Sequence, residues 1–289
     1  MALVMLSDSY SLKFLYYILK ARGLNDVISG SAQTQITLTN LDKVLVPNPP
    51  IKIQQKIAAI LDEADKLRRL NKKLIKKYEQ LSQSLFLEMF GDPVSNPKRW
   101  ETVKFSSVGK LDRGKSKHRP RNAPKLLGGP YPLIQTGDVA NSQGYIKEFK
   151  NTYSEIGLAQ SKIWPKGTLC ITIAANIAKT GILTFDACFP DSVVGFVPNN
   201  ETVNEYVQSW ISFLQKIIEE KAPAVAQKNI NLSILRDIEF MKPPKSMQLK
   251  FSSYVREIEL QKVQAQQSIK KSEELFNSLL QRAFKGELV

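Results

Sequence analysis

The sequence has very few of the residues that build metal sites, disulfides and hydrolytic active sites. Histidine occurs once, as His118, and cysteine twice, as Cys170 and Cys188. A single histidine excludes a multi-histidine metal site, and His118 has no suitable serine and aspartate setting for a catalytic triad. The cysteines lie in apolar stretches without a second ligand at metal spacing, so we expect reduced core thiols and a cytoplasmic protein.

Long hydrophobic runs are also missing. No stretch of about eighteen apolar residues occurs, and the apolar start, residues 1–6, is too short for a signal peptide and is followed by Asp8. We therefore expect no segment that crosses a membrane.

Acidic residues are outnumbered by basic ones. The chain of 289 residues has 41 Lys and Arg against 27 Asp and Glu, a formal charge of +14. Such a charge favours polyanionic partners, and nucleic acid is the leading candidate. Charge alone also fits a protein that is basic only for solubility, so other features must decide.

The chain contains an internal repeat. Residues 32–90 recur without a gap at residues 226–284, an offset of 226 − 32 = 194. A Pro-Pro pair followed by glutamine and lysine marks both copies, at residues 49–56 and 243–250. Each copy then continues for a long stretch without proline or glycine, which predicts a long helix of about 50 Å.

Apolar residues in both predicted helices follow steps of three and four, as in a coiled coil. In the first copy these are Ile57, Ile60, Ala64, Leu67, Leu74, Tyr78, Leu81 and Leu85, and the polar Asn71 falls on the same spacing, so we expect it in the seam. In the second they are Val255, Ile258, Ala265, Ile269, Phe276, Leu279 and Ala283, interrupted by Lys262 and Ser272. An ordinary helical hairpin explains one such run, but two similar helices around one domain favour an antiparallel coiled-coil spacer.

The segment between the helices has a different pattern. Short β-type runs at residues 168–173, 181–185 and 192–197 are separated by turn residues, and residues 204–220 have the pattern of an amphipathic helix. Residues 11–29 align loosely with residues from 205 onward and predict the last helix of a second such domain. The expected fold class is α+β: a mixed α/β domain flanked by two long helices.

Residues 109–116 match the Walker A pattern of nucleotide hydrolases, which makes such an enzyme the main alternative function. A P-loop needs a buried strand before it and a helix beginning at its Lys-Ser pair. Here Lys115 and Ser116 are followed by a segment with two prolines, Pro120 and Pro124, which cannot continue a helix. We therefore reject nucleotide hydrolysis.

Two further motifs also have structural explanations. Asn48-Pro-Pro-Ile51 resembles the base-binding motif of adenine methyltransferases, but Ile51 replaces the stacking aromatic ring, and the repeated Pro-Pro pair indicates a helix entry. Asp138, Asp186 and Asp191 have no nuclease spacing and are expected to be cap or turn residues. We find no catalytic site.

What remains is a basic stretch and three polar loops whose side chains suit DNA recognition. Arg and Lys bond guanine edges or phosphates, and Gln and Asn bond adenine. The loops cover residues 113–125, 135–141, 174–179 and 227–231. The candidate DNA-binding residues are Arg113, Lys115, Ser116, Lys117, His118, Arg119, Arg121, Lys125, Gln135, Thr136, Asn176, Lys179, Gln227, Lys228 and Asn229. A solvated mobile loop is the alternative for the basic stretch.

Three features together resemble a known family, the specificity (S, or HsdS) subunits of type I restriction-modification systems. The first is the doubled Pro-Pro-x-x-x-Gln-x-Lys helix entry, and the second is the ending at residues 279–288. The third is the domain entry at residues 97–100, with the motifs at 129–134 and 164–168. They span nearly the whole chain.

The resemblance implies a non-catalytic DNA-recognition subunit with four parts: a remnant of a first target-recognition domain (1–48), a central long helix (49–90), a complete target-recognition domain (91–245) and a distal long helix (246–289). It implies double-stranded DNA, methylation subunits and restriction subunits as partners. S-adenosylmethionine and ATP are expected on those subunits, with no cofactor on this chain.

A full family member has two recognition domains, whereas this chain has one and the tail of another. It is similar to a half-length or truncated subunit. One hypothesis is a homodimer through the long helices that reads two inverted half-sites; the other is an incomplete product of gene rearrangement. A coiled-coil adaptor that does not bind DNA is a further alternative to the recognition function.

Overall fold

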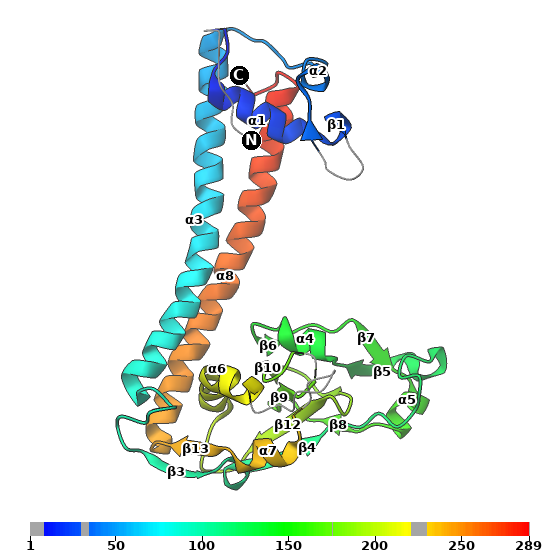
Figure 1. Ribbon diagram of the computed structural model, residues 1–289, viewed down its shortest axis with the longest axis vertical. Helices are drawn as coiled ribbons and strands as arrows, with labels where there is room; N and C mark the ends of the chain where they lie inside the picture. Colours follow the sequence, from blue (N-terminus) through cyan, green and yellow to red (C-terminus); the bar gives the residue numbers. More distant parts are fainter. Residues whose placement is uncertain (1–8, 30–34, 175, 221–229, 289) are drawn as a thin grey trace. The chain divides into compact units, whose positions relative to one another are not determined.

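The computed structural model describes residues 9–29, 35–174, 176–220 and 230–288, and the chain divides into two compact units (Figure 1). The first unit comprises residues 1–80 and 259–289, and the second comprises residues 81–258. Both long helices, α3 (Ile51–Phe90) and α8 (Lys245–Phe284), contribute one end to each unit.

The two long helices predicted from the repeat are confirmed. Each has 40 residues, or about 60 Å at 1.5 Å per residue, which is longer than the expected 50 Å. Both begin directly after a Pro-Pro pair, and the Pro50 and Pro244 carbonyls accept early helical bonds, from the backbone N–H groups of Gln54 (3.1 Å) and Gln248 (3.2 Å). A proline suits this place because the first helical N–H groups need no partner within the helix.

Within the first unit the two long helices lie antiparallel (Figure 1). Ile57, near the start of α3, shares a core with Leu280, near the end of α8. Further along α3, the Asn71 side chain donates to the Ser268 carbonyl (3.3 Å) and to the Ser272 hydroxyl (3.4 Å). Asn71 therefore lies in the seam between the helices, as predicted.

One half of the predicted α3 seam is wrong. The heptad column Ile60, Leu67, Leu74 and Leu81 is exposed, by 39%, 46%, 38% and 49%. The less exposed column lies one residue later: Leu61 is fully buried, and Arg68, Ile75 and Ser82 are half-buried. That column continues through Arg68 and Ser82, so its hydrophobic signal is weaker than that of the exposed column, and periodicity alone selects the wrong one.

The rest of the first unit is a small N-terminal structure. Its helix α1 (Leu12–Arg22) buries Phe14, Tyr17 and Ile18 against the long helices. After α1 come η1 (Asn25–Val27), β1 (Ile28–Ser29), β2 (Gln35–Ile36) and α2 (Leu38–Leu41), with β1 and β2 paired antiparallel.

The second unit is built around a five-stranded sheet in the order β4-β12-β9-β10-β6. Its strands are β4 (Gly109–Arg113), β12 (Val193–Pro198), β9 (Leu169–Thr172), β10 (Thr180–Leu183) and β6 (Gly144–Ile146). Helix α6 (Asn204–Glu220) packs on this sheet, with Trp210 and Ile211 in the main core. The helix predicted at 204–220 and the three predicted strand runs are therefore confirmed.

Two smaller sheets complete the domain. One has the order β7-β5-β11-β8, from β7 (Asn151–Tyr153), β5 (Leu127–Leu133), β11 (Ala187–Cys188) and β8 (Ile163–Trp164). The other pairs β3 (Glu101–Lys104) with β13 (Glu239–Lys242). The short helices are η2 (Phe105–Ser107), η3 (Pro124–Leu126), α4 (Thr136–Ala140), α5 (Glu155–Ala159) and α7 (Leu232–Asp237).

Trp164 connects the four- and five-stranded sheets. Its ring stacks on Phe189 with centroids 4.9 Å apart. It also covers Gly195 of β12, where an added Cβ would lie 2.6 Å from the ring. The mixed helix and strand composition confirms the α+β class. Among the described residues, no helix is both long and apolar enough to span a bilayer.

Candidate nucleic-acid interface

The predicted DNA-binding loops meet at one end of the five-stranded sheet. Arg113, the last residue of β4, pairs with Val194 near the start of β12. Thr172, the last residue of β9, pairs with Val193, the first residue of β12. Because these neighbours are antiparallel, the loop that leaves β4 and the loop that leaves β9 emerge side by side.

Hydrogen bonds between backbone groups connect these loops directly. The Gly114 N–H donates to the Val193 carbonyl at 2.9 Å. The Ile173 N–H donates to the Ser192 carbonyl at 3.1 Å, and the Ile230 N–H donates to the Ile173 carbonyl at 2.9 Å. The starts of the loops at 113–125 and 174–179 and the end of the loop at 227–231 thus lie at one end of the sheet, even though more than a hundred residues separate the first loop from the last.

The second loop joins the same end of the sheet. It contains α4, and the Ser142 hydroxyl just after it lies 3.3 Å from the carbonyl of Thr180, the first residue of β10. Asp138 caps α4 by accepting from the Gln135 N–H at 2.9 Å. The prediction that Asp138 is a cap residue is confirmed, and the cap fixes the start of this loop.

A pocket of about 440 Å³ lies between the first two loops and brings together Arg121, Gln135 and Thr136. Its other lining residues are Asn122, Leu127, Leu133, Asn151, Tyr153, Pro190 and Ser192. Amide, hydroxyl and guanidinium groups therefore border one depression, and these are the groups that bond base edges. Asn122 belongs to the predicted loop 113–125 although it was not named as a contact residue. Sequence reasoning missed Asn151 and Ser192, because only the pairing of β5 with β7 and the chain after β11 bring them here.

The basic loop is ordered by an acidic residue from across the sheet end. Asp191 accepts from Arg121 and lies 3.4 Å from the guanidinium of Arg119. Arg119 also donates to the Ser116 carbonyl at 2.5 Å and to the His118 carbonyl at 3.0 Å. Two of the predicted DNA-binding arginines thus contact Asp191, and Arg119 also bonds the backbone of its own loop.

Other predicted residues are exposed and have no ion pair within the described part of the chain. They are Arg113, Lys115, Lys117 and Lys125. Asn176 and Lys179 are also exposed, and the Lys179 ammonium lies 3.2 Å from the Gln215 side-chain oxygen. Unpaired cations on one edge are suited to phosphate contacts.

Five predicted residues remain: Ser116 and His118, which the structure describes, and three that lie outside the described residues. Ser116 is only 5% exposed, so its hydroxyl is not part of the surface. His118 is held by its backbone N–H, which donates to the Gln160 side chain at 3.0 Å. Residues 227–229, which contain the predicted Gln227, Lys228 and Asn229, lie outside the described residues.

The Walker A match is explained by packing. Its first five residues form β4, and an added Cβ at Gly109 would lie 2.4 Å from the Phe196 ring. An added Cβ at Gly114 would lie 2.2 Å from the Phe189 carbonyl. No helix begins at Lys115 and Ser116, so the nucleotide-hydrolase alternative is not supported.

The remaining chemical groups have separate structural roles. Asp186 accepts from the Lys166 N–H at 2.7 Å, as a turn residue does. Cys170 and Cys188 are free and buried, as predicted, and burial raises the pKa of both thiols. Within the described residues no group of histidine, cysteine and carboxylate side chains is arranged to hold a metal ion.

These features define a class of protein, in which a basic α+β domain is joined to two long antiparallel helices. The chain belongs to the family described as type I restriction modification DNA specificity domain, whose model matches residues 6–80 and 97–271. The chain is therefore a type I restriction-modification specificity subunit.

The similarities extend over nearly the whole chain. It is 22% identical to the type I restriction enzyme MjaIX specificity subunit of Methanocaldococcus jannaschii, covering 97% of this chain and 70% of the relative. Two solved structures share the fold. The type I restriction-modification S subunit from M. genitalium matches with TM-score 0.61 at 17% identity, over 96% of this chain and 73% of that one. The HsdS subunit from Thermoanaerobacter tengcongensis matches with TM-score 0.52 at 18% identity, over 96% and 70%.

Proposed function

We propose that this chain selects the DNA sequence at which a type I restriction-modification complex acts, by binding one half of a bipartite target with the second unit. The observation that carries the proposal is the convergence of four polar loops at one end of the β4-β12-β9-β10-β6 sheet. The exposed cations there would bind phosphates, and Gln135, Thr136 and Asn176 would contact bases.

The chain itself would carry out no reaction. Methylation subunits, with S-adenosylmethionine, would modify adenine, and restriction subunits, with ATP, would cleave. This division follows from family membership together with the separate structural roles of Asp138, Asp186 and Asp191 described above. Such a complex would act on DNA in the cytoplasm.

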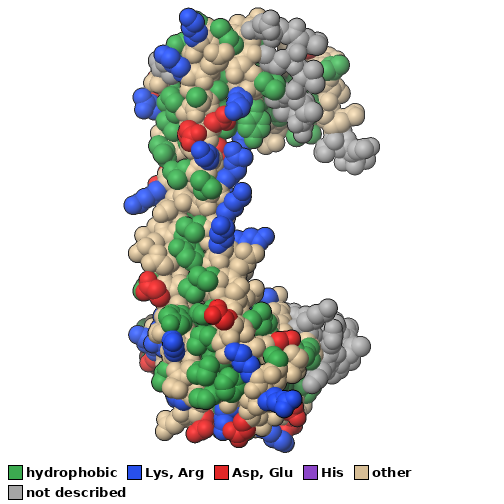
Figure 2. All heavy atoms as spheres, turned by 90° about the vertical axis from the view of Figure 1, so that its left-hand side faces the viewer, with side chains coloured by type: hydrophobic (Ala, Val, Ile, Leu, Met, Phe, Trp, Pro, Cys, Tyr) green, Lys and Arg blue, Asp and Glu red, His purple; other side chains and the backbone are tan. Residues whose placement is uncertain are grey.

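The long helices would bind the partner subunits. The exposed column on α3 supports this assignment, because Ile60, Leu67 and Leu74 recur every seven residues and therefore lie on one face of the helix. Figure 2 shows hydrophobic side chains along this side of the long helices, with lysines and arginines beside them. An apolar row of this kind fits a helix of another protein.

Each part of the chain would have its own role in recognition. Residues 1–48 would be the tail of a first recognition domain, 91–245 the complete recognition domain, and 49–90 and 246–289 the helical spacer. Two chains joined through the helices would present two recognition domains to two inverted half-sites. Light scattering of the purified chain tests this dimer, and a stable monomer on DNA would contradict it.

The direct test of recognition has two steps. DNA fragments that bind are selected from a randomised pool and sequenced, and the affinity of the selected fragments is then measured by fluorescence anisotropy at several salt concentrations. A recognition domain predicts enrichment of one motif, with affinity that falls as salt rises. Binding that depends on salt but enriches no motif would favour a merely basic protein, and no binding would favour a coiled-coil adaptor.

A further inference from the structure

Two ion pairs occupy matching places in the two copies of the repeat, with opposite polarity. In the first unit, Lys13 of α1 pairs with Asp62 of α3. In the second unit, Glu205 of α6 pairs with Arg256 of α8, at 2.7 Å between Nε and Oε1. We call α1 and α6 the docking helices, because each packs against a long helix. At this contact the docking helix contributes the cation in the first unit and the carboxylate in the second.

The equivalence of the long-helix residues follows from the repeat. Asp62 and Arg256 are separated by the repeat offset (256 − 62 = 194), and each lies eight residues after a fully buried glutamine, Gln54 or Gln248. They therefore occupy the same place on their helices.

The equivalence of the docking helices follows from hydrogen bonds to those glutamines. The Ser11 N–H donates to Oε1 of Gln54 at 2.8 Å, and the Val203 N–H donates to Oε1 of Gln248 at 3.3 Å. The charged residue comes two positions later in both helices, as Lys13 and Glu205. The sequence offset between the two docking helices is thus 203 − 11 = 192 residues, whereas the offset between the two long helices is 194 residues.

Both carboxylates are held in the ionised form. The hydrogen bond from Lys13 lowers the pKa of Asp62, which also accepts from the Tyr17 hydroxyl at 2.7 Å. Burial opposes ionisation of Glu205, whose side chain is 7% exposed, but the bond from Arg256 still lowers its pKa. Loss of Arg256 would leave the buried Glu205 carboxylate without its cation, whereas loss of Lys13 would leave the half-buried Asp62 without its own.

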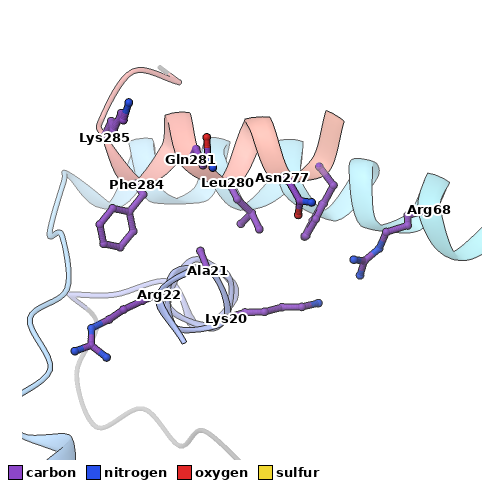
Figure 3. Close-up of a pocket in the computed structure, with 10 residues that line it drawn as sticks. Lys20, Ala21, Arg22, Arg68, Asn277, Leu280, Gln281, Phe284 and Lys285 are labelled. Atoms are coloured by element: carbon purple, nitrogen blue, oxygen red, sulfur yellow. The ribbon is translucent and has the colours of Figure 1, made fainter. Parts of the chain in front are cut away.

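The apolar contacts of the two docking helices, α1 and α6, begin in the same way. The first buried apolar residue of α1 is Phe14 and that of α6 is Tyr206, at the same place in the two copies. In Figure 3, α1 lies beside the last turns of α8, with Leu280 directed toward it. A large aromatic side chain therefore anchors both docking helices.

We propose that Lys13, Asp62, Glu205 and Arg256 form a polarity key that decides which long helix each docking helix joins. In the exchanged arrangement α1 would place Lys13 against Arg256, and α6 would place Glu205 against Asp62. Both contacts are repulsive, so the exchange is disfavoured at both places. If the proposed function holds, the key also fixes which recognition domain, from this chain or a second copy, is carried at which end of the helices.

Hydrogen–deuterium exchange of the full chain tests the key, because it reports α1 and α6 separately. Lys13→Glu is expected to speed exchange in residues 12–22 by roughly two- to five-fold, while residues 204–220 stay unchanged. Asp62→Arg is expected to restore slow exchange to the Lys13→Glu variant. Glu205→Lys and Arg256→Glu should behave in the same way for residues 204–220.

A charge change in the other unit distinguishes specific pairing of these four residues from a general effect of net charge. Arg256→Glu should fail to restore α1 in the Lys13→Glu variant, and Lys56→Glu, at an exposed lysine of α3, should change neither helix. Tyr17 donates to Asp62 of α3 and packs against Phe276 of α8. In the double variant Lys13→Glu/Glu205→Lys, a photo-crosslinker at Tyr17 should shift its products from α3 and late α8 toward residues 245–258.

Two results would overturn the key: unchanged exchange in both single variants, or rescue of Lys13→Glu by Arg256→Glu. Crosslinks that stay on α3 in the double variant would also count against it. The proposed function can fail independently of this pairing. In that case the wild-type chain would not bind DNA with sequence selectivity, but the variants would still show the expected changes in hydrogen exchange.

Discussion

Gln54 and Gln248 make the same hydrogen bond at the same distance: each donates its Nε2 to the carbonyl of the proline five residues earlier, at 2.8 Å. Each amide also donates to a residue before the docking helix, Ser9 at 3.1 Å or Glu201 at 3.3 Å. A single buried side chain thus joins the start of each long helix to the chain that enters the docking helix. This arrangement explains why Pro-Pro-x-x-x-Gln occurs twice.

We expect Gln248→Ala to destabilise the second unit by about 1–3 kcal/mol, because it leaves the buried Pro243 carbonyl and the Thr202 hydroxyl unpaired. Chemical denaturation followed by tryptophan fluorescence measures this change. Gln55→Ala, at an exposed neighbour of Gln54, is the control and should have little effect. Equal stability of the two variants would show that the glutamine anchor is unimportant.

Acid stability should depend on Arg256. The lowered pKa of Glu205 means that this carboxylate stabilises the fold above its unfolded-state pKa, and the stabilisation is lost as pH falls through the folded pKa. In Arg256→Met the opposing charge is gone and burial raises that pKa. Acid unfolding, followed by circular dichroism, should therefore begin at a higher pH than in the wild type. Lys250→Met, on the exposed face of the same helix, should leave the transition where it is.

Phosphate and base contacts should respond differently to mutation. Lys117→Ala and Lys125→Ala are each expected to weaken binding to all DNA sequences and to reduce the salt slope by about one. Gln135→Ala should instead cost about 1–3 kcal/mol on the preferred sequence alone. Anisotropy titrations on matched and mismatched duplexes distinguish these outcomes. If Gln135→Ala weakened all sequences equally, it would not be a base-reading residue.

The Walker-like lysine should have no role in ATP turnover. We expect Lys115→Ala to lower DNA affinity modestly and to leave phosphate release from ATP at the background level of the wild-type chain. Phosphate release that is measurable in the wild type and abolished by Lys115→Ala would restore the hydrolase alternative.

Much of the scaffold could be predicted because its signals are local. The Pro-Pro entries and the absence of glycine and proline define α3 and α8, and short apolar runs between turn residues define β9, β10 and β12. The four-stranded sheet could not be predicted, since β8 and β11 have two residues each and their pairing depends on distant chain segments. Likewise, half of the α3 seam could not be located, because Arg68 and Ser82 weaken the hydrophobic signal of that column.

The candidate interface was predictable in composition but not in geometry. Side-chain types alone pointed to the basic loop and to Gln135, Thr136 and Asn176. The ion pair of Arg121 with Asp191 was not predictable, because it joins residues 70 positions apart. Nor did composition reveal that Ser116 is buried, since that depends on how its loop packs on the sheet.

The most direct test of DNA selection is to purify the chain with the methylation subunit encoded beside it and to map the adenines that the complex methylates. The wild-type complex should methylate one defined motif, and a variant in which residues 135–141 are replaced should methylate a different or degenerate one. A motif that survives the replacement, or methylation without any motif, would contradict the assignment of target selection to this end of the sheet.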